Sequence, residues 1–478
     1  MTSVADVTMA LLARAGAPLL VVAGEAAGAV GAAERRGLPM LRVATEAGAV
    51  FAAAAAADIE SAPGAVVIAG GDAGRIAAAL DVARREQIPL VCLTSVDDAR
   101  LTDVAKATLH VVSASASHWI AQALRLSLAR PRGPVHLVVP DELWTAPTVP
   151  VATAVQRAPS AAPDTREVAR AATLIRSAVR PVVIAGGDGR DAAAWIRAFT
   201  EALAAPIVTT WKGRGVVADP HPLCFGLATS GGGRRVLARA DLVIALGLTA
   251  VDLVDFAARA PVLLVGVGLE PDALLKPALS IATDVGTLLA ELAPRLGGAR
   301  ADWDVAELDR WKRATDTRSG VTADLDPARV VAIAREAMPA GTIAAFDSAL
   351  RDAAAGWDCV APGDLVVTAR AEARGFAVPA AIAAASLRRD AVALAFTDVA
   401  GFGAAAGELA TAARVGAAIG VIVVGDDDTA RAAIAVPPGV SHVRAATSTS
   451  LAIELGRVLG ERRPLVVDAT ASAATRPV

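Results

Sequence analysis

The sequence predicts an α/β protein made of three doubly wound domains, each with a mainly parallel sheet. Short runs of Val, Ile and Leu alternate along the chain with longer stretches rich in Ala, Arg and Leu. Continuous apolar runs are typical of strands buried on both faces of a parallel sheet, and their alternation with helical stretches indicates βαβ units. This pattern starts three times within 478 residues, a length that accords with about three domains.

The first domain is predicted over residues 1–150. Helical stretches are expected at Ala73–Gln87 and His118–Ala129. The apolar runs between the helical stretches are the candidate strands, namely Pro18–Ala23, Ala65–Ala69, Pro89–Thr94 and Val135–Val139. Residues Trp144 to Asp164 are rich in Pro, Ala and Thr without sustained periodicity, so they are predicted to form a linker.

The second and third domains are predicted over residues 165–298 and 325–478. Candidate strands of the second are Pro181–Ala185, Ala205–Thr210, Leu242–Leu246 and Val262–Val265. Those of the third are Thr342–Phe346, Asp364–Val367, Ala391–Phe396 and Gly420–Val424. Between the two domains, Gly297–Pro327 contains a Gly-Gly pair, a charged tract and an Asp-Pro pair, so we expect a second linker with a short helix.

Composition excludes several classes of protein. The chain has 46 Lys+Arg against 49 Asp+Glu, whereas a nucleic-acid binder carries a basic surface. Its 54% of hydrophobic residues argues against disorder, which requires low hydrophobicity. The run Ala47–Ala57 is closed by Asp58 and is shorter than the roughly 20 apolar residues of a membrane span. We therefore expect a folded protein with neither a nucleic acid nor a membrane as partner.

The cysteines and the N-terminus predict a cytoplasmic protein. Cys92, Cys224 and Cys359 are odd in number and far apart, so they indicate neither a disulfide framework nor a metal pair. The first residues lack a basic region followed by an apolar core, which a signal peptide requires.

Several common catalytic motifs are missing. The sequence has no G-x-x-x-x-G-K-[ST] phosphate loop, no H-E-x-x-H and no G-x-S-x-G. No G-x-G-x-x-G follows a strand, which argues against a nicotinamide enzyme. Gly70–Gly74 and Gly186–Gly189 each follow a predicted strand, where a helix N-terminus could hold an anion or a plain turn could require the glycines. His136 lies in an apolar run and is interpreted as a core residue.

Three phrases in the second domain point to one family. Ala185-Gly186-Gly187 precedes Pro206-Ile-Val-Thr-Thr-Trp-Lys-Gly-Arg-Gly-Val-Val, and Asp219-Pro-His-Pro-Leu with Gly226 follows. Ala240-Asp-Leu-Val-Ile-Ala-Leu-Gly247 comes next. In this order, they resemble the central domain of the thiamine-diphosphate-dependent decarboxylase and acetolactate synthase superfamily.

The flanking domains are similar to the same superfamily. Arg130–Asp141 resembles the phrase that closes its pyrimidine-binding domain, and Glu46 falls where the family carries its catalytic glutamate. In the third domain, Gly375-Phe376 resembles the glycine-rich turn that opens the diphosphate-binding half. Gly401-Phe402 and Glu408–Ala412 resemble the helix that follows the metal motif. The resemblance implies a pyrimidine-binding domain, a central domain and a diphosphate-binding domain, with Gly375, Phe376, Gly401 and Phe402 at the cofactor.

The resemblance gives Glu46 a chemical role. A carboxyl group in an apolar pocket at a strand end would have a raised pKa and could share a proton with the aminopyrimidine ring of the cofactor. The cofactor would then act as the electron sink for decarboxylation of a 2-keto acid. A second interpretation remains, because Thr45-Glu46 precedes an Ala-rich helix and an acid at a helix N-terminus is stabilising without catalysis.

The metal motif departs from the family pattern. The family has Gly-Asp-Gly followed some two dozen residues later by an Asn pair, and these ligate Mg²⁺. Here Asp398-Val-Ala stands in the place of Gly-Asp-Gly, and Gly425-Asp426 in the place of the Asn pair. Asp398, Asp426 and Asp427 are therefore the candidate Mg²⁺ ligands, although Mg²⁺ tolerates little misplacement of its oxygen ligands.

Two functions stay open at this point. The first is an acetolactate synthase-like lyase or carboligase that uses thiamine diphosphate and Mg²⁺ on a small-molecule substrate, a 2-keto acid or related ketone. The second is a relative that has lost thiamine diphosphate and acts as a cofactor-free enzyme or a non-catalytic subunit. Some relatives hold FAD in the central domain, and the sequence does not decide this. Since the family builds its site from two chains, a homodimer or a dimer of dimers is expected.

Overall fold

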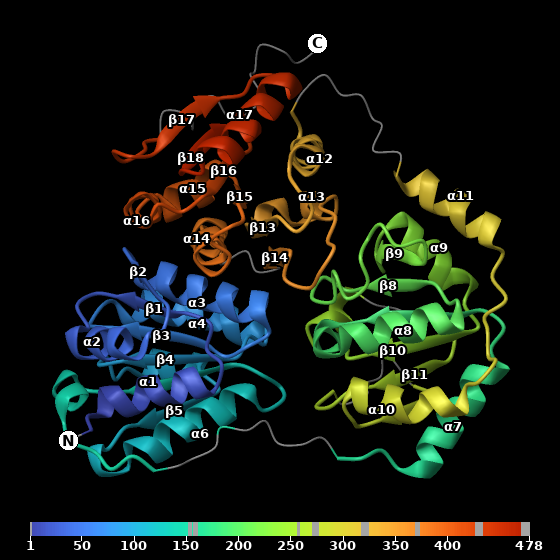
Figure 1. The fold of residues 1–478 in the computed structure, drawn as a ribbon, viewed down its shortest axis with the longest axis horizontal. Helices are drawn as coiled ribbons and strands as arrows, with labels where there is room; N and C mark the ends of the chain where they lie inside the picture. Colours follow the sequence, from blue (N-terminus) through green and yellow to red (C-terminus); the bar gives the residue numbers. More distant parts are fainter. Residues whose placement is uncertain are drawn as a thin grey trace. The chain divides into compact units, whose positions relative to one another are not determined.

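The computed structural model describes residues 2–151, 155, 161–255, 259–269, 277–316, 325–368, 373–425 and 434–469. These residues form three six-stranded sheets, all of whose strand pairs are parallel (Figure 1). The chain divides into two compact units. The paired unit comprises Met1–Arg157, Thr322–Trp357 and Leu365–Val478, and the central unit comprises Ala158–Val321 and Asp358–Asp364. The predicted fold class is confirmed.

The first sheet of the paired unit has the order β2-β1-β3-β4-β6-β5. Its strands are β1 Leu20–Ala23, β2 Met40–Val43, β3 Gly64–Ile68, β4 Leu90–Thr94, β5 Ala107–His110 and β6 Pro134–Val138. Its helices are α1 Val4–Arg14, α2 Ala27–Arg36, α3 Glu46–Glu60, α4 Ala73–Arg85, α5 Ala99–Val104 and α6 Ala116–Leu128. Successive residues of β1 enter two different core clusters, because side chains alternate between the faces of a sheet.

The other sheet of the paired unit repeats this order as β14-β13-β15-β16-β18-β17. Its strands are β13 Ile343–Phe346, β14 Leu365–Val367, β15 Ala393–Thr397, β16 Ile419–Val423, β17 Ser441–Arg444 and β18 Leu465–Asp468. The helices are α12 Pro327–Ala337, α13 Arg351–Ala354, α14 Ala377–Leu387, α15 Val399–Ala405, α16 Glu408–Val415 and α17 Ser448–Glu461. Counted from the first strand of each sheet, both orders are 2-1-3-4-6-5, so two domains of one topology lie in this unit.

These two domains pack through α3 and α14, which lie against each other between the sheets (Figure 1). Phe51 of α3 and Phe376, which precedes α14, meet edge to face with ring centroids 5.5 Å apart. Every residue of α3 from Gly48 to Ala57 is buried. The small side chains of this Ala-rich helix allow α14 and α4 of the same chain to approach closely.

The central unit has the sheet order β12-β11-β10-β7-β8-β9. Its strands are β7 Pro181–Ala185, β8 Ile207–Thr209, β9 Cys224–Leu227, β10 Leu242–Leu246, β11 Val262–Val265 and β12 Leu279–Ile281. Its helices are α7 Thr165–Ser177, α8 Ala193–Leu203, α9 Gly231–Arg239, α10 Val285–Leu292 and α11 Val305–Asp316. Counted from β7, the order is the 3-2-1-4-5-6 arrangement of doubly wound nucleotide-binding sheets.

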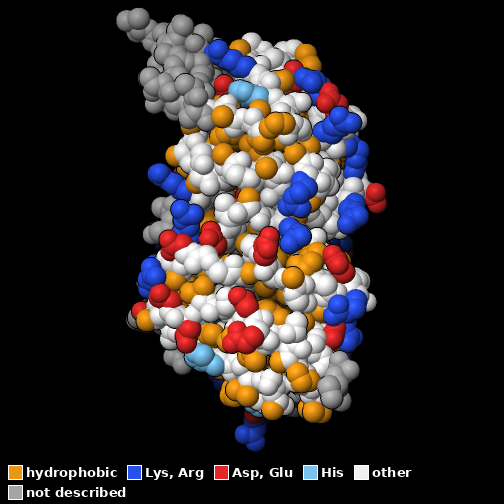
Figure 2. Space-filling view, turned by 90° about the vertical axis from the view of Figure 1, so that its left-hand side faces the viewer, with side chains coloured by type: hydrophobic (Ala, Val, Ile, Leu, Met, Phe, Trp, Pro, Cys, Tyr) orange, Lys and Arg blue, Asp and Glu red, His pale blue; other side chains and the backbone are white. Residues whose placement is uncertain are grey.

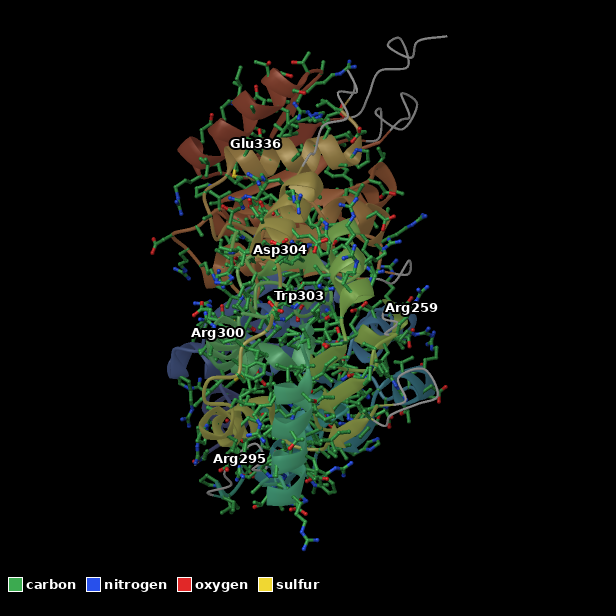
Figure 3. All side chains as sticks on the ribbon, turned by 90° about the vertical axis from the view of Figure 1, so that its right-hand side faces the viewer. Arg259, Arg295, Arg300, Trp303, Asp304 and Glu336 are labelled. Atoms are coloured by element: carbon green, nitrogen blue, oxygen red, sulfur yellow. The ribbon has the colours of Figure 1, made fainter. Side chains whose placement is uncertain are left out.

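The segment predicted as the second linker begins as part of this unit. Trp303, labelled in Figure 3, is buried, and its indole Nε1 donates a hydrogen bond to the carbonyl of Pro181 at 3.0 Å. Arg239 on α9 stacks over the ring of Trp311 on α11, 5.4 Å from the ring centroid. The short helix expected in this segment is therefore α11, and it packs against α9.

A buried ion pair attaches a second segment to the central unit. Arg214 Nη2 lies 2.7 Å from Asp219 Oδ2, and the two side chains are 4% and 9% exposed. The same carboxylate oxygen accepts a hydrogen bond from the backbone N–H of Cys359 at 2.7 Å, and Asp219 N–H donates to the carbonyl of Cys359 at 2.9 Å. Asp219 therefore holds the segment Asp358–Asp364, whose flanking residues belong to the paired unit.

His136 is a core residue, as expected. It lies in β6 with no exposed surface, and its Nε2 is 3.1 Å from the Thr94 hydroxyl. That hydroxyl donates to the carbonyl of Val96, so it accepts from His136, which assigns a neutral ring with Nε2 protonated. Burial lowers the pKa of His136 from 6.5 to about 4.

This histidine predicts acid sensitivity. Between pH 6.5 and 4 the unfolded chain binds a proton that the folded chain does not, so the unfolding free energy falls as the pH falls through this range. The pKa difference corresponds to about 3 kcal/mol. Denaturant titrations at about pH 7 and about pH 4 measure it. His136→Gln keeps a donor toward Thr94 without titrating and should lose most of that pH dependence, and an unchanged slope would contradict the assignment.

None of the helices in the described part of the chain is both long and apolar enough to cross a membrane. The face of the molecule shown in Figure 2 mixes basic, acidic and hydrophobic side chains.

Candidate functional site

Glu46 is the first residue of α3. Thr45 is the N-cap of this helix, and its hydroxyl accepts a hydrogen bond from the N–H of Gly48 at 3.0 Å. The Glu46 side chain is 22% exposed, and its Oε2 lies 3.9 Å from Arg75 Nη1. Its Oε1 accepts a hydrogen bond from the N–H of Asp72 at 3.3 Å. Both features behind the two interpretations of Glu46 are thus present, a carboxylate at a strand end and an acid in the first turn of a helix.

The surroundings of Glu46 within one chain are polar, not the apolar pocket that the sequence suggested. The carboxylate meets the turn between β3 and α4, where Gly71 has a φ of +100°. A Cβ at position 71 would lie 2.8 Å from Glu46 Oε1, so this glycine permits the approach of the side chain. Asp72 in the same turn N-caps α4 through a bond from Gly74 N–H at 2.7 Å. The glycine-rich turn therefore positions Glu46 and starts a helix.

A second group of acids lies at the carboxyl ends of β13 and β15, which are neighbours in the sheet. Asp347 follows β13, is 1% exposed, and accepts hydrogen bonds from the Thr397 hydroxyl at 2.5 Å and the Ala377 N–H at 2.9 Å. Burial raises the pKa of Asp347. Asp347 was not among the residues predicted from the sequence, although ligands of such sheets bind at the carboxyl ends of the strands.

Asp398, the first candidate metal ligand, follows β15 beside Asp347. Its Oδ1 accepts a hydrogen bond from the N–H of Gly401 at 2.6 Å and so caps α15. A Cβ at Gly401 would lie 2.2 Å from Asp347 Oδ2 and 2.5 Å from the Thr397 hydroxyl oxygen. Gly401 is thus required by the packing of these two side chains.

The other predicted cofactor residues are placed by packing. Gly375 has a φ of +76°, and a Cβ there would lie 3.1 Å from the Gly401 carbonyl oxygen. Phe376 and Phe402 are 3% and 1% exposed, and both belong to the core cluster that the two domains share. Their rings are therefore not available to a ligand in this chain, and only backbone atoms of these residues could face one.

Asp426 and Asp427 lie outside the described residues. β16 ends at Val423, which pairs with Thr397, the residue before Asp398. Within the described part of the chain, no group of three or more His, Cys, Asp or Glu side chains is placed to hold a metal ion. Among the described residues, the carboxylates of Asp347 and Asp398 lie at the ends of neighbouring strands, and carboxylate oxygens are the hard ligands that Mg²⁺ prefers.

In sheets of this order, nucleotides bind outside the carboxyl ends of the strands where the order reverses, here β7 and β10. Here the Asp252 side chain, 4% exposed, fills that position. It accepts hydrogen bonds from Gly187 N–H at 3.1 Å and from the N–H and hydroxyl of Thr249 at 2.8 and 2.9 Å. A Cβ at Gly186 would lie only 2.8 Å from its Oδ2. FAD, which the sequence left open, is not part of the function proposed below.

A known family model matches the central unit. Residues 168–292, which include all of β7–β12, match the family model described as "Thiamine pyrophosphate enzyme, central domain". These residues belong to the central-domain family of thiamine-diphosphate-dependent enzymes. The resemblance drawn from the sequence phrases is thereby confirmed.

Curated members of the superfamily match parts of the chain. A probable 2-ketoarginine decarboxylase of Pseudomonas aeruginosa is 30% identical over 45% of this chain and 42% of its own length. The acetolactate synthase isozyme 1 large subunit of Escherichia coli is 28% identical over 55% of this chain and 52% of its own. The human 2-hydroxyacyl-CoA lyase 1 is 37% identical over 18% of this chain and 14% of its own. The chain thus spans about half the length of the first two relatives.

Proposed function

We propose that the protein is a thiamine-diphosphate-dependent lyase or carboligase that breaks or makes a carbon–carbon bond next to the carbonyl of a 2-keto acid. The observation that carries this proposal is Glu46, an acid in the first turn of α3 with its tip held by Asp72 N–H, in a chain whose central unit matches this family. The names of the relatives, a decarboxylase, a synthase and a lyase, support the reaction class.

The residues have separate tasks in this proposal. Glu46 holds and transfers a proton at its carboxylate, the general acid–base role in which side chains usually contribute about 10²–10⁴-fold. Asp398, Asp426 and Asp427 would hold Mg²⁺, which neutralises the diphosphate. When bound, thiamine diphosphate supplies the electron sink that decarboxylation needs. The buried core around α3 and α14 keeps the acid-bearing helix in one orientation.

A turnover assay tests the proposal and narrows the substrate. The purified chain is incubated with thiamine diphosphate, Mg²⁺ and a panel of 2-keto acids that includes 2-ketoarginine, pyruvate and 2-ketobutyrate, and released CO₂ and ligated products are measured. We expect turnover of at least one member that stops when either thiamine diphosphate or Mg²⁺ is omitted. Turnover without the cofactor would favour the cofactor-free alternative instead.

We propose a homodimer or a dimer of dimers as the assembled form. Within one chain, the Glu46 carboxylate accepts its hydrogen bond from Asp72 N–H of the N-terminal domain, whereas Asp347 and Asp398 accept theirs from residues of the C-terminal domain. Light scattering at micromolar concentration should give a mass of two or four chains, and a monomer would contradict the proposal. A cytoplasmic location stays a prediction of the sequence.

A further inference from the structure

A buried carboxylate of the C-terminal domain binds the start of the helix that carries Glu46. Glu408, the first residue of α16, is 1% exposed. Its Oε1 accepts hydrogen bonds from the N–H of Thr45 at 2.9 Å and from the Thr45 hydroxyl at 2.7 Å. Its Oε2 accepts from the N–H of Ala44 at 3.1 Å. One side chain therefore occupies three neighbouring donors immediately before Glu46.

Residues of both helices restrict the contact between Glu408 and the start of α3. Thr411, one turn along α16, donates its hydroxyl to Glu408 Oε2 at 3.0 Å and so restricts the glutamate side chain. On the other side, a Cβ at Gly48 would lie 2.3 Å from Glu408 Oε1. The glycine of the Thr45-Glu46-Ala47-Gly48 phrase thus makes room for a carboxylate from another domain. Hydrogen bonds to a charged acceptor are roughly twice as strong as those between neutral groups.

We propose that Glu408 is a positioning residue for Glu46, an inference that rests on the function proposed above. Thr45 is the N-cap of α3 and the main partner of Glu408. It also directly precedes Glu46 in the chain. The carboxylate of Glu46 accepts a hydrogen bond from Asp72 N–H. The backbone of Glu46 lies in the first turn of α3, which this N-cap holds. Glu408 therefore determines where α3 starts, and with it the direction in which Glu46 extends.

The alternative is that Glu408 only holds the two domains together. Both accounts predict some loss of stability when Glu408 is changed, so stability does not separate them. Positioning predicts in addition that the start of α3 becomes mobile, that the side chain at position 46 changes its accessibility, and that turnover falls without a change in the affinity for substrate.

Three variants make the test. Glu408→Gln keeps the size of the side chain but replaces one acceptor oxygen by an NH₂ group, which cannot accept from the donors of Thr45 or Ala44. Gly48→Ala displaces Glu408 from the other side of the contact. Asp304→Asn is the matched control, because Asp304 (Figure 3) also caps a helix with its carboxylate, through the N–H of Ala306 at 2.9 Å, but does so at α11 of the central unit.

The first two readouts use the protein without cofactor. We expect amide hydrogen exchange in the segment 44–48 to be about tenfold faster in Glu408→Gln and Gly48→Ala, and unchanged in Asp304→Asn. For accessibility, Glu46→Cys introduces a thiol beside natural cysteines that are all buried, namely Cys92, Cys224 and Cys359. Adding Glu408→Gln should speed maleimide labelling of that thiol about fivefold. Unchanged exchange and labelling would overturn the proposal, whether or not thiamine diphosphate binds.

The third readout uses the cofactor-loaded protein. We expect Glu408→Gln to lower kcat by about 10-fold to 100-fold, because a small misplacement of a reacting group is costly. KM and the affinity for thiamine diphosphate should stay within about threefold. The change removes no direct contact with substrate or cofactor, and loss of such a contact is what raises KM. Faster exchange and labelling with an unchanged kcat would overturn the positioning role. If the unmodified protein neither binds the cofactor nor turns over, the proposed function fails, and exchange and labelling alone decide whether Glu408 sets the position of residue 46.

Discussion

Glu46→Gln abolishes turnover and leaves the binding of thiamine diphosphate nearly intact, if Glu46 performs the proton transfer proposed for it. Glutamine keeps the size and polarity of the side chain and can still accept the hydrogen bond from Asp72 N–H, but it cannot exchange a proton. We expect a loss of about 10³-fold or more in kcat, at the upper end of general acid–base effects. Steady-state kinetics and calorimetry on the same preparation measure the two quantities.

Glu60→Gln is the matched control for this variant. Glu60 is the last residue of the same helix, and its side chain is 40% exposed, with Oε1 3.9 Å from Arg388 Nε. The same chemical change there should leave kcat within about twofold, because Glu60 lies at the opposite end of α3 from Glu46. Its loss should also cost little stability, since exposed ion pairs contribute little to the unfolding free energy. A Glu46→Gln protein that keeps most of the normal kcat would show that Glu46 is only a helix N-terminal acid.

We expect Asp219→Ala to lower the unfolding free energy of the central unit more than the removal of an exposed ion pair does. The variant removes the carboxylate from Arg214, whose side chain is 4% exposed, and removes the acceptor of the Cys359 N–H. Breaking a buried ion pair by removing one partner costs about 3–5 kcal/mol. Guanidinium unfolding followed by tryptophan fluorescence measures the change, because Trp303 is buried in this unit.

Asp309→Ala provides the comparison. Asp309 pairs with Arg313 one turn later on α11 at 2.5 Å, but both side chains are more than half exposed. Its removal should cost less than about 1 kcal/mol. Equal effects of the two variants would mean that Asp219 does not hold the segment Asp358–Asp364 as the structure indicates.

The fold could be predicted where strands are buried on both faces. Strands such as β7 and β10 are continuous apolar runs, and the sequence identifies them because burial leaves no polar positions. The edge strands β2 and β17 were not identified, and the buried strand β18 was not identified either. β2 contains the exposed Arg42, and β17 reads Ser-His-Val-Arg with three exposed residues, so neither has an apolar run. Their pairing with β1 and β18 is decided by the rest of the sheet.

The candidate site could be predicted only in part. Glu46 and Asp398 were found because a family phrase surrounds each of them. Asp347 was missed, because a single acid after a strand carries no motif until β13 and β15 are known to be neighbours. The role of Glu408 was missed for a similar reason: its partner Thr45 lies 363 positions away, and no local pattern records a contact at that separation.

The most direct test of the proposed function is calorimetry of the unmodified protein with thiamine diphosphate and Mg²⁺. The account predicts saturable binding that disappears when the metal is chelated. It also predicts that Asp398→Asn loses this binding although asparagine is as good an N-cap for α15 as aspartate, because the change removes a charge from the metal site and keeps the helix. No binding at millimolar thiamine diphosphate would contradict the account and leave the cofactor-free alternative.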